Sequence, residues 1–77
     1  MEIEVISFGK IAELITIKKL ILDTILDTDE FRKYLEETYP ELKKLKYKLA
    51  VDKQIVQENR KLMDGSIVAI MPPFSGG

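Results

Sequence analysis

The chain has 77 residues and a formal net charge of −1, and it contains no cysteine and no histidine. Without these two residue types the protein has no disulfide, no thiolate nucleophile, and no histidine to act as a general base or metal ligand. A net charge near zero gives no bulk attraction to nucleic acid or anionic membranes, and the basic run in residues 43–48 is interpreted as a solvated face. No apolar run approaches the roughly 20 residues of a membrane span, and the N-terminus is acidic where a signal peptide is basic. We therefore expect one small cytoplasmic domain that binds no metal.

Two strands are predicted near the N-terminus. Residues 2–8 alternate and are rich in β-branched and aromatic side chains, which is typical of a strand. The alternation assigns the side chains to two faces: Ile3, Val5 and Ser7 to one, Ile6 and Phe8 to the other. Gly9 ends this strand, and residues 10–14 fit either a short helical turn or a loop. Residues 16–22 are predicted to form the second strand, in a hairpin with the first.

A helix is predicted to begin after Asp27. Asp27 followed by Glu30 matches a capping box, in which the first side chain accepts a hydrogen bond from a free backbone N–H group. Five side chains then recur at the spacing of one helix face: Phe31, Tyr34, Leu35, Thr38 and Tyr39. Pro40 disfavours helical backbone at the residue before it, so the helix ends there.

The second half of the chain reads as three further strands. Residues 47–51 alternate, and a short strand at 55–56 follows a turn. Asp64-Gly65 is a strong turn signal. Residues 67–71 are apolar on both faces, which predicts a central strand that is fully buried, and Pro72 stops it.

The predicted order is strand, strand, helix, strand, short strand, strand. In an α+β domain of this kind the helix covers one face of the sheet. If the first and last strands lie side by side, the hairpin makes the sheet mixed, which is the β-grasp arrangement of ubiquitin. We therefore predict a β-grasp domain over residues 1–71, with a mixed sheet of four to five strands and one main helix, and a flexible tail over residues 72–77.

The tail ends in Gly76-Gly77. With glycine at about 7% of residues, two terminal glycines occur by chance in roughly one chain in two hundred. Glycine loses the most conformational freedom when it is fixed, but its bare backbone can enter a narrow site on another protein. The pair therefore favours a working C-terminal carboxylate; the alternative is a frayed end with no role.

The chain resembles the small, sulfur-carrying subunits of molybdopterin synthase, within the MoaD/ThiS family of β-grasp sulfur carriers. The strongest part of the match is residues 68–77, an apolar strand followed by two prolines, an apolar residue, a small residue and two glycines. Five further segments match: residues 3–8, Glu13-Leu14, residues 39–42, residues 49–52, and Leu62 with Asp64-Gly65. Ala12 departs from the family, which often has arginine there.

The resemblance implies a carrier cycle that acts on Gly77. An adenylyltransferase similar to ubiquitin-activating enzyme uses ATP to adenylate Gly77, and sulfur then replaces AMP to leave a thiocarboxylate. Within the large subunit of molybdopterin synthase, the carrier donates this sulfur to cyclic pyranopterin monophosphate. The resemblance also implies a heterotetramer, a carrier that is no enzyme by itself, and no cofactor bound to it, since ATP is consumed by the partner.

Besides Gly76 and Gly77, six residues are predicted to bind a partner: Phe8, Ile70, Pro72, Pro73, Phe74 and Ser75. The prolines stiffen the stem of the tail, and the small residues slim its tip. Phe8 and Ile70 are interpreted either as part of an exposed apolar patch that docks the large subunit, or as core residues under the helix. Phe74 is interpreted as either a core lid or a partner anchor.

Three other functions stay open. The thiamine-thiazole sulfur carrier belongs to the same family and also ends in two glycines, but it usually lacks the two prolines. An ubiquitin-like protein modifier would use the same adenylated tail to form an isopeptide with a lysine. A plain β-grasp interaction module would carry an inert tail.

Overall fold

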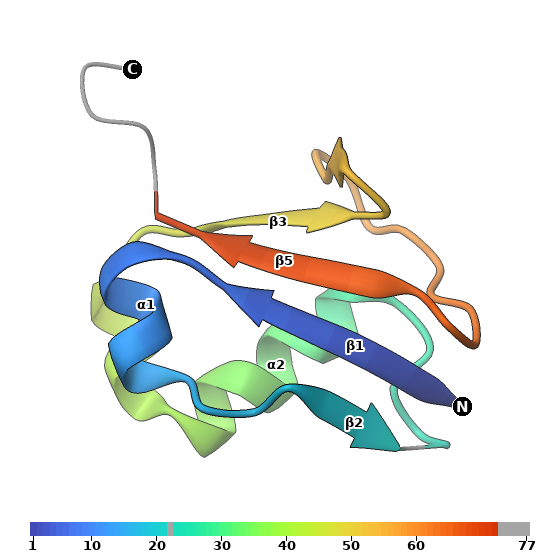
Figure 1. The fold of residues 1–77 in the computed structure, drawn as a ribbon, viewed down its shortest axis with the longest axis horizontal. Helices are drawn as coiled ribbons and strands as arrows, with labels where there is room; N and C mark the ends of the chain where they lie inside the picture. The colour runs from blue at the N-terminus through green and yellow to red at the C-terminus, as the bar shows by residue number, and fades with distance from the viewer. Residues whose placement is uncertain (22, 73–77) are drawn as a thin grey trace.

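Five strands form one mixed sheet in the order β2-β1-β5-β3-β4 (Figure 1). The computed structural model describes residues 1–21 and 23–72. The strands are β1 (Glu2–Ser7), β2 (Lys19–Ile21), β3 (Lys48–Val51), β4 (Gln54–Ile55) and β5 (Ile67–Met71). β1 and β5 are parallel and adjacent, while the β1–β2, β3–β5 and β3–β4 pairs are antiparallel. The prediction that the first and last strands lie side by side in a mixed sheet is confirmed.

The main helix, α2 (Thr28–Thr38), begins where the capping box predicts. The Asp27 side chain accepts a hydrogen bond from the Glu30 N–H at 2.9 Å. Phe31 and Leu35 are fully buried. Thr38 was predicted on the same face, but it is exposed at the end of the helix, where its hydroxyl stays in water. Leu42, from the 3₁₀-helix η1 (Pro40–Lys44), supplies the next buried side chain instead.

The core lies between α2 and one face of the sheet, and the other face is open. Ile3, Val5, Val68 and Ile70 point inward, as the alternation predicts for β1. The prediction that β5 is buried on both faces is wrong. Val68 and Ile70 are 0% exposed, but Ile67 is 38% exposed because no helix covers the outer face. Figure 1 shows α2 on one side of the sheet only.

The two segments that follow β1 are a short helix and a short strand. Residues 9–14, which fit either a helical turn or a loop, form a six-residue helix, α1 (Gly9–Leu14). The second strand is shorter than predicted: β2 covers Lys19–Ile21 and does not include residues 16–18, while Leu22 lies outside the described residues. α1 turns the chain away from the sheet, so residues 15–18 return to β1 only at their end. No helix within the described residues is long and apolar enough to cross a membrane.

Tyr47 ties the segment before β3 to α2. Its O–H group donates to a Glu36 carboxylate oxygen at 2.6 Å, and the Arg32 guanidinium lies 5.3 Å from the centre of its ring. Burial of the phenol and the adjacent Glu36 carboxylate raise the pKa of Tyr47 from 10.0 to about 12.

We predict that the free energy of unfolding of the wild type falls more than that of Tyr47→Phe between about pH 10 and pH 12. Above pH 10 the unfolded tyrosine loses its proton while the folded one keeps it. The stabilisation is therefore complete below pH 10 and is lost as the pH rises through 12. Since Tyr47 is only half-buried, we expect a difference of about 1 kcal/mol or less, measured by urea unfolding at each pH. Equal pH slopes for the two proteins would contradict the assignment.

Candidate functional site

The stem of the tail leaves the sheet at the end of its central strand. Pro72 is the last described residue and follows β5 directly. Five predicted site residues lie outside the described residues: Pro73, Phe74, Ser75, Gly76 and Gly77. The site is therefore built here from the surface around Pro72.

Gly9 holds the base of the stem. Its φ angle is +59°, a conformation that favours glycine, and a Cβ atom at this position would lie 3.2 Å from Cγ of Pro72. The Phe8 N–H donates to the Ile70 carbonyl at 3.1 Å, so the residue before α1 is bonded to the end of β5, just before the stem. From the sequence, Gly9 was predicted only to end the first strand. Its place beside Pro72 depends on the β1–β5 pairing, which no local pattern reveals.

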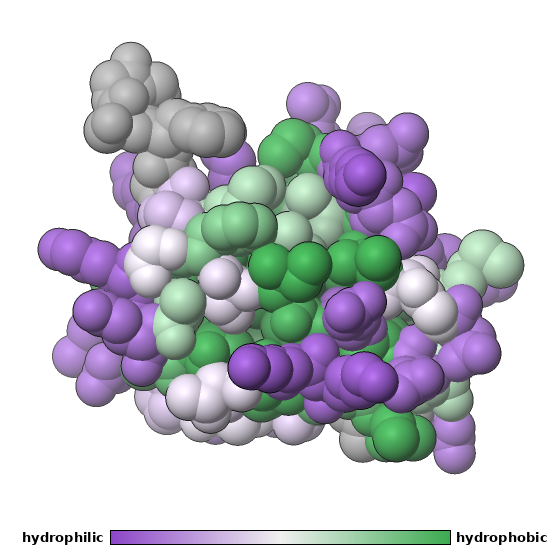
Figure 2. All heavy atoms as spheres, viewed as in Figure 1, coloured by the Kyte–Doolittle hydropathy of each residue, from purple (hydrophilic) through white to green (hydrophobic). Residues whose placement is uncertain are grey.

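An apolar patch covers the open face of the sheet and reaches the stem. It consists of Ile6 and Phe8 from the β1 end, Ile67, Ala69 and Met71 of β5, Ala50 of β3 and Ile55 of β4. Ala69 lies at its centre, paired with Ile6 on one side and Ala50 on the other. In Figure 2 the hydrophobic side chains gather over β1, β5 and β3. We call this set the outer-face patch.

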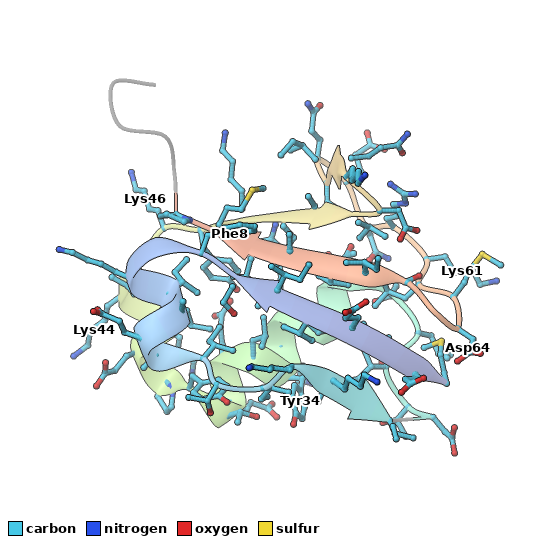
Figure 3. The ribbon with its side chains drawn as sticks, viewed as in Figure 1. Phe8, Tyr34, Lys44, Lys46, Lys61 and Asp64 are labelled. Carbon is cyan, nitrogen blue, oxygen red and sulfur yellow. The ribbon has the colours of Figure 1, made fainter. Side chains whose placement is uncertain are left out.

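Of the two residues predicted to form an exposed apolar patch, only one does so. Phe8 is 49% exposed and stands beside the end of β5 (Figure 3). Ile70 is 0% exposed, so the prediction that it caps an exposed patch is wrong and its alternative, burial under the helix, holds. Strand alternation explains this, because Val68 and Ile70 face the core while Met71 faces outward. Met71, directly before Pro72, is the residue that the sequence analysis missed.

Lysines surround the stem end of the outer-face patch. Lys48 pairs with Met71 across the β3–β5 ladder, and Figure 3 shows Lys46 beside the end of β5. All four lysines of the basic run are exposed: Lys43, Lys44, Lys46 and Lys48. In the described part of the chain none of the four forms an ion pair, and their exposure agrees with a solvated basic face.

The acidic turn residues have structural roles, as predicted. One oxygen of Asp52 accepts the Ile67 N–H at 3.0 Å, and one oxygen of Asp64 accepts the Glu2 N–H at 2.6 Å. Within residues 1–21 and 23–72, no three His, Cys, Asp or Glu side chains gather as a metal site would require.

The mixed sheet with β1 and β5 side by side, its single covering helix and the stem at the end of the central strand define an ubiquitin-like β-grasp protein. Within that class, the chain belongs to the ThiS family, whose model matches residues 5–77. The predicted fold and the resemblance to the MoaD/ThiS sulfur carriers are thereby confirmed.

Two known proteins are similar to this chain over its whole length. The chain is 32% identical to the molybdopterin synthase sulfur carrier subunit of Caenorhabditis elegans over an alignment 83 positions long. The match covers 100% of this chain and 99% of that protein. The crystal structure of SAMP1 from Haloferax volcanii superposes with a TM-score of 0.72 over 100% of both chains. At 18% identity, the SAMP1 match shows a shared fold.

Proposed function

We propose that this protein is the sulfur carrier of molybdenum cofactor biosynthesis and the small subunit of a molybdopterin synthase. The observation that carries the proposal is the 32% identity, over the full length of the chain, to a molybdopterin synthase sulfur carrier subunit. The two prolines before the terminal glycines agree with that assignment. The carrier works with the synthase large subunit and is no enzyme by itself.

The chemistry takes place at the carboxylate of Gly77. A carboxylate is a poor acyl donor because its oxygen is a poor leaving group. In the proposed cycle, a carboxylate oxygen attacks the α-phosphorus of ATP on the partner adenylyltransferase, and pyrophosphate leaves. A sulfur nucleophile then displaces AMP from the acyl carbon to give the thiocarboxylate. Transfer of the sulfur to cyclic pyranopterin monophosphate, with attack of water on the acyl carbon, returns the carrier to its carboxylate form.

The surface around Pro72 suits delivery of this group into a partner. Six residues from Pro72 to the C-terminus span up to about 20 Å when extended, which is enough to enter a buried site. The outer-face patch begins at the base of the stem, so a partner that covers the patch is placed to receive the tail. Phe8 and Met71 lie nearest the stem and are proposed as docking residues, and Ile70 supports them from the core.

We predict that Gly9→Ala slows thiocarboxylate formation about three- to tenfold, because the added methyl group displaces Pro72 and misdirects the stem. Gly65→Ala is the matched control. Gly65 also has a positive φ, +85°, so its variant also bears a backbone cost of about 1 kcal/mol, but nothing lies within 4 Å of the added methyl group. We expect Gly65→Ala to react at less than about a twofold lower rate. Equal slowing in both variants would show a loss of stability and no role in orienting the stem.

An intact-mass measurement tests the proposed function. The protein is incubated with ATP, its adenylyltransferase and a sulfur source, and we expect the C-terminal peptide to exchange one oxygen for sulfur. Reaction of the product with the large subunit and cyclic pyranopterin monophosphate should then yield molybdopterin. Lysine-linked conjugates without sulfur exchange would identify a protein modifier instead. If neither product forms, both the carrier and the modifier functions are wrong.

The match to the ThiS family model favours one second candidate, a thiamine-thiazole sulfur carrier. Its product is the same thiocarboxylate, so the mass measurement does not separate the two. Supplying the thiocarboxylate to thiazole synthase in one reaction and to the molybdopterin synthase large subunit in another does separate them. We expect turnover in the second reaction.

A further inference from the structure

A groove of about 600 Å³ follows the free edge of β1. One wall contains Ile6, whose side chain faces outward, and also Val5 and Ser7, whose side chains face the core side. Because both faces of the strand line the same groove, the groove runs along the strand's edge. The opposite wall is Ala12 of α1 and residues 15–19.

The groove exists because β2 leaves β1 early. The β1–β2 register ends at the Glu4–Lys19 pair, with one further hydrogen bond from the Val5 N–H to the Lys18 carbonyl at 2.8 Å. β1 continues to Ser7 along β5, so its last part has a partner strand on one side only. The free stretch, from the Val5 carbonyl to Ser7, is about 7 Å long at the usual rise per residue.

Ser7 presents unpaired polar groups to this groove. Ser7 lies opposite Ile70 in the parallel ladder, and the Ile70 carbonyl bonds to the Phe8 N–H. In a parallel ladder, when the carbonyl of one residue accepts from the strand beside it, the N–H and C=O of the residue paired with it point away from that strand. The N–H and C=O of Ser7 therefore point away from β5 and toward the groove. Such groups are costly to leave unpaired, so the groove is suited to a polar backbone.

We propose that this groove binds a short extended peptide of a partner protein, which adds to β1 as an extra strand. The β1 edge supplies the backbone hydrogen bonds of such β-augmentation. The apolar side chains of Ile15 and Ile17 favour apolar residues at alternate positions of the peptide. Lys18 is exposed at the rim and forms no ion pair in the described chain, which favours an acidic residue at the end of the peptide. This site shares only Ile6 with the outer-face patch, and it does not depend on sulfur transfer.

The test is an NMR titration of the full chain with a blocked pentapeptide, aspartate-valine-threonine-valine-aspartate. We expect a dissociation constant of about 0.1–1 mM, chemical-shift changes centred on residues 5–7 and 15–18, and at least about tenfold slower hydrogen exchange of the Ser7 amide at saturation. The control peptide has its three inner amides N-methylated, so it keeps every side chain and charge but its three inner residues cannot donate backbone hydrogen bonds. It should bind at least about tenfold more weakly.

Two variants test the charge preference. Lys18→Glu should weaken the acidic peptide about three- to tenfold. Lys61→Glu, at the end of the molecule away from α1 (Figure 3), should leave its affinity unchanged. The proposal is overturned if the N-methylated peptide binds equally well, or if the shifts centre on the outer-face patch. It is also overturned if the Ser7 amide of the free protein is already protected as strongly as that of Val68, because residues 16–18 would then be paired with β1.

Discussion

Deletion of Gly77 is expected to abolish sulfur loading and to leave the melting temperature of the protein nearly unchanged. This result is expected because the proposed chemistry uses the carboxylate of Gly77 itself. An adenylyltransferase site that admits bare backbone must place a carboxylate oxygen of the tail within bonding distance of the α-phosphorus of ATP. A tail shortened by one residue, about 3.5 Å, does not reach. The readout is the intact mass after incubation with ATP, the adenylyltransferase and a sulfur source.

The unchanged melt follows from where the core lies. The buried cluster of the described chain runs from Ile3 to Ile70, and the residues that hold the stem are Gly9 and Pro72. Deletion of the last residue removes none of these contacts, so we expect a shift in melting temperature of under about 2 °C. A drop several times larger would show that the tail stabilises the fold.

Gly77→Ala is the matched variant for the deletion. It keeps the length of the tail and its carboxylate, and adds one methyl group next to the reacting carbon. We expect loading to slow by at least about tenfold, since a channel shaped for backbone has no room for the methyl group. Full loading of the deletion variant, through the carboxylate of Gly76, would contradict the proposed cycle. Full loading of Gly77→Ala alone would contradict only the narrow channel.

Local patterns in the sequence predicted most of the fold correctly. The alternation in residues 2–8 placed Ile3 and Val5 on the same face, which is the buried one, and the capping box at Asp27 predicted the start of α2. These succeeded because each signal lies within a few residues and is not altered by tertiary contacts. The β1–β5 pairing was predicted from topology and not from a local signal, since the two strands are about 60 residues apart in the chain.

The errors about β5 and Ile70 have a common origin: a pattern shows which residues are apolar but not which faces are covered. Residues 67–71 are apolar on both sides, so β5 was predicted to be buried on both, yet a chain with one main helix can cover only one face of its sheet. For the same reason Ile70, which is buried, was predicted to bind a partner, and the half-buried Met71 was left out. In the proposed synthase, the large subunit covers the outer face, and the two-sided apolar pattern of β5 is then satisfied in the complex.

The length of β2 was mispredicted for a different reason. Residues 16–22 have strand-forming composition, but α1 displaces the chain before it reaches β1, and only Lys19–Ile21 pair. The length of β2 depends on whether residues 10–14 form a helix or a loop, and the sequence is compatible with both. The groove beside Ser7 is therefore a consequence of helix placement that composition does not reveal.

Met71→Glu is expected to weaken binding to the molybdopterin synthase large subunit at least about 100-fold, or roughly 2.7 kcal/mol. Met71 is half-buried on the outer face, next to the stem, where a docked partner would remove it from water. A carboxylate there would be buried without a partner in the complex, which is costly. In the free protein it faces Lys48 across the ladder, so the fold itself should tolerate it.

Met63→Glu is the matched control, because Met63 is 70% exposed in the loop before β5 and lies outside the outer-face patch. We expect less than about a threefold change in affinity, measured by isothermal titration calorimetry with the large subunit, and sulfur loading of both variants assayed separately by mass. Met71→Leu keeps an apolar side chain of similar size and should restore binding to near the wild-type value. Equal loss in the Met63 and Met71 variants would indicate a general charge effect, and undiminished binding of Met71→Glu would place the docking surface elsewhere on the sheet.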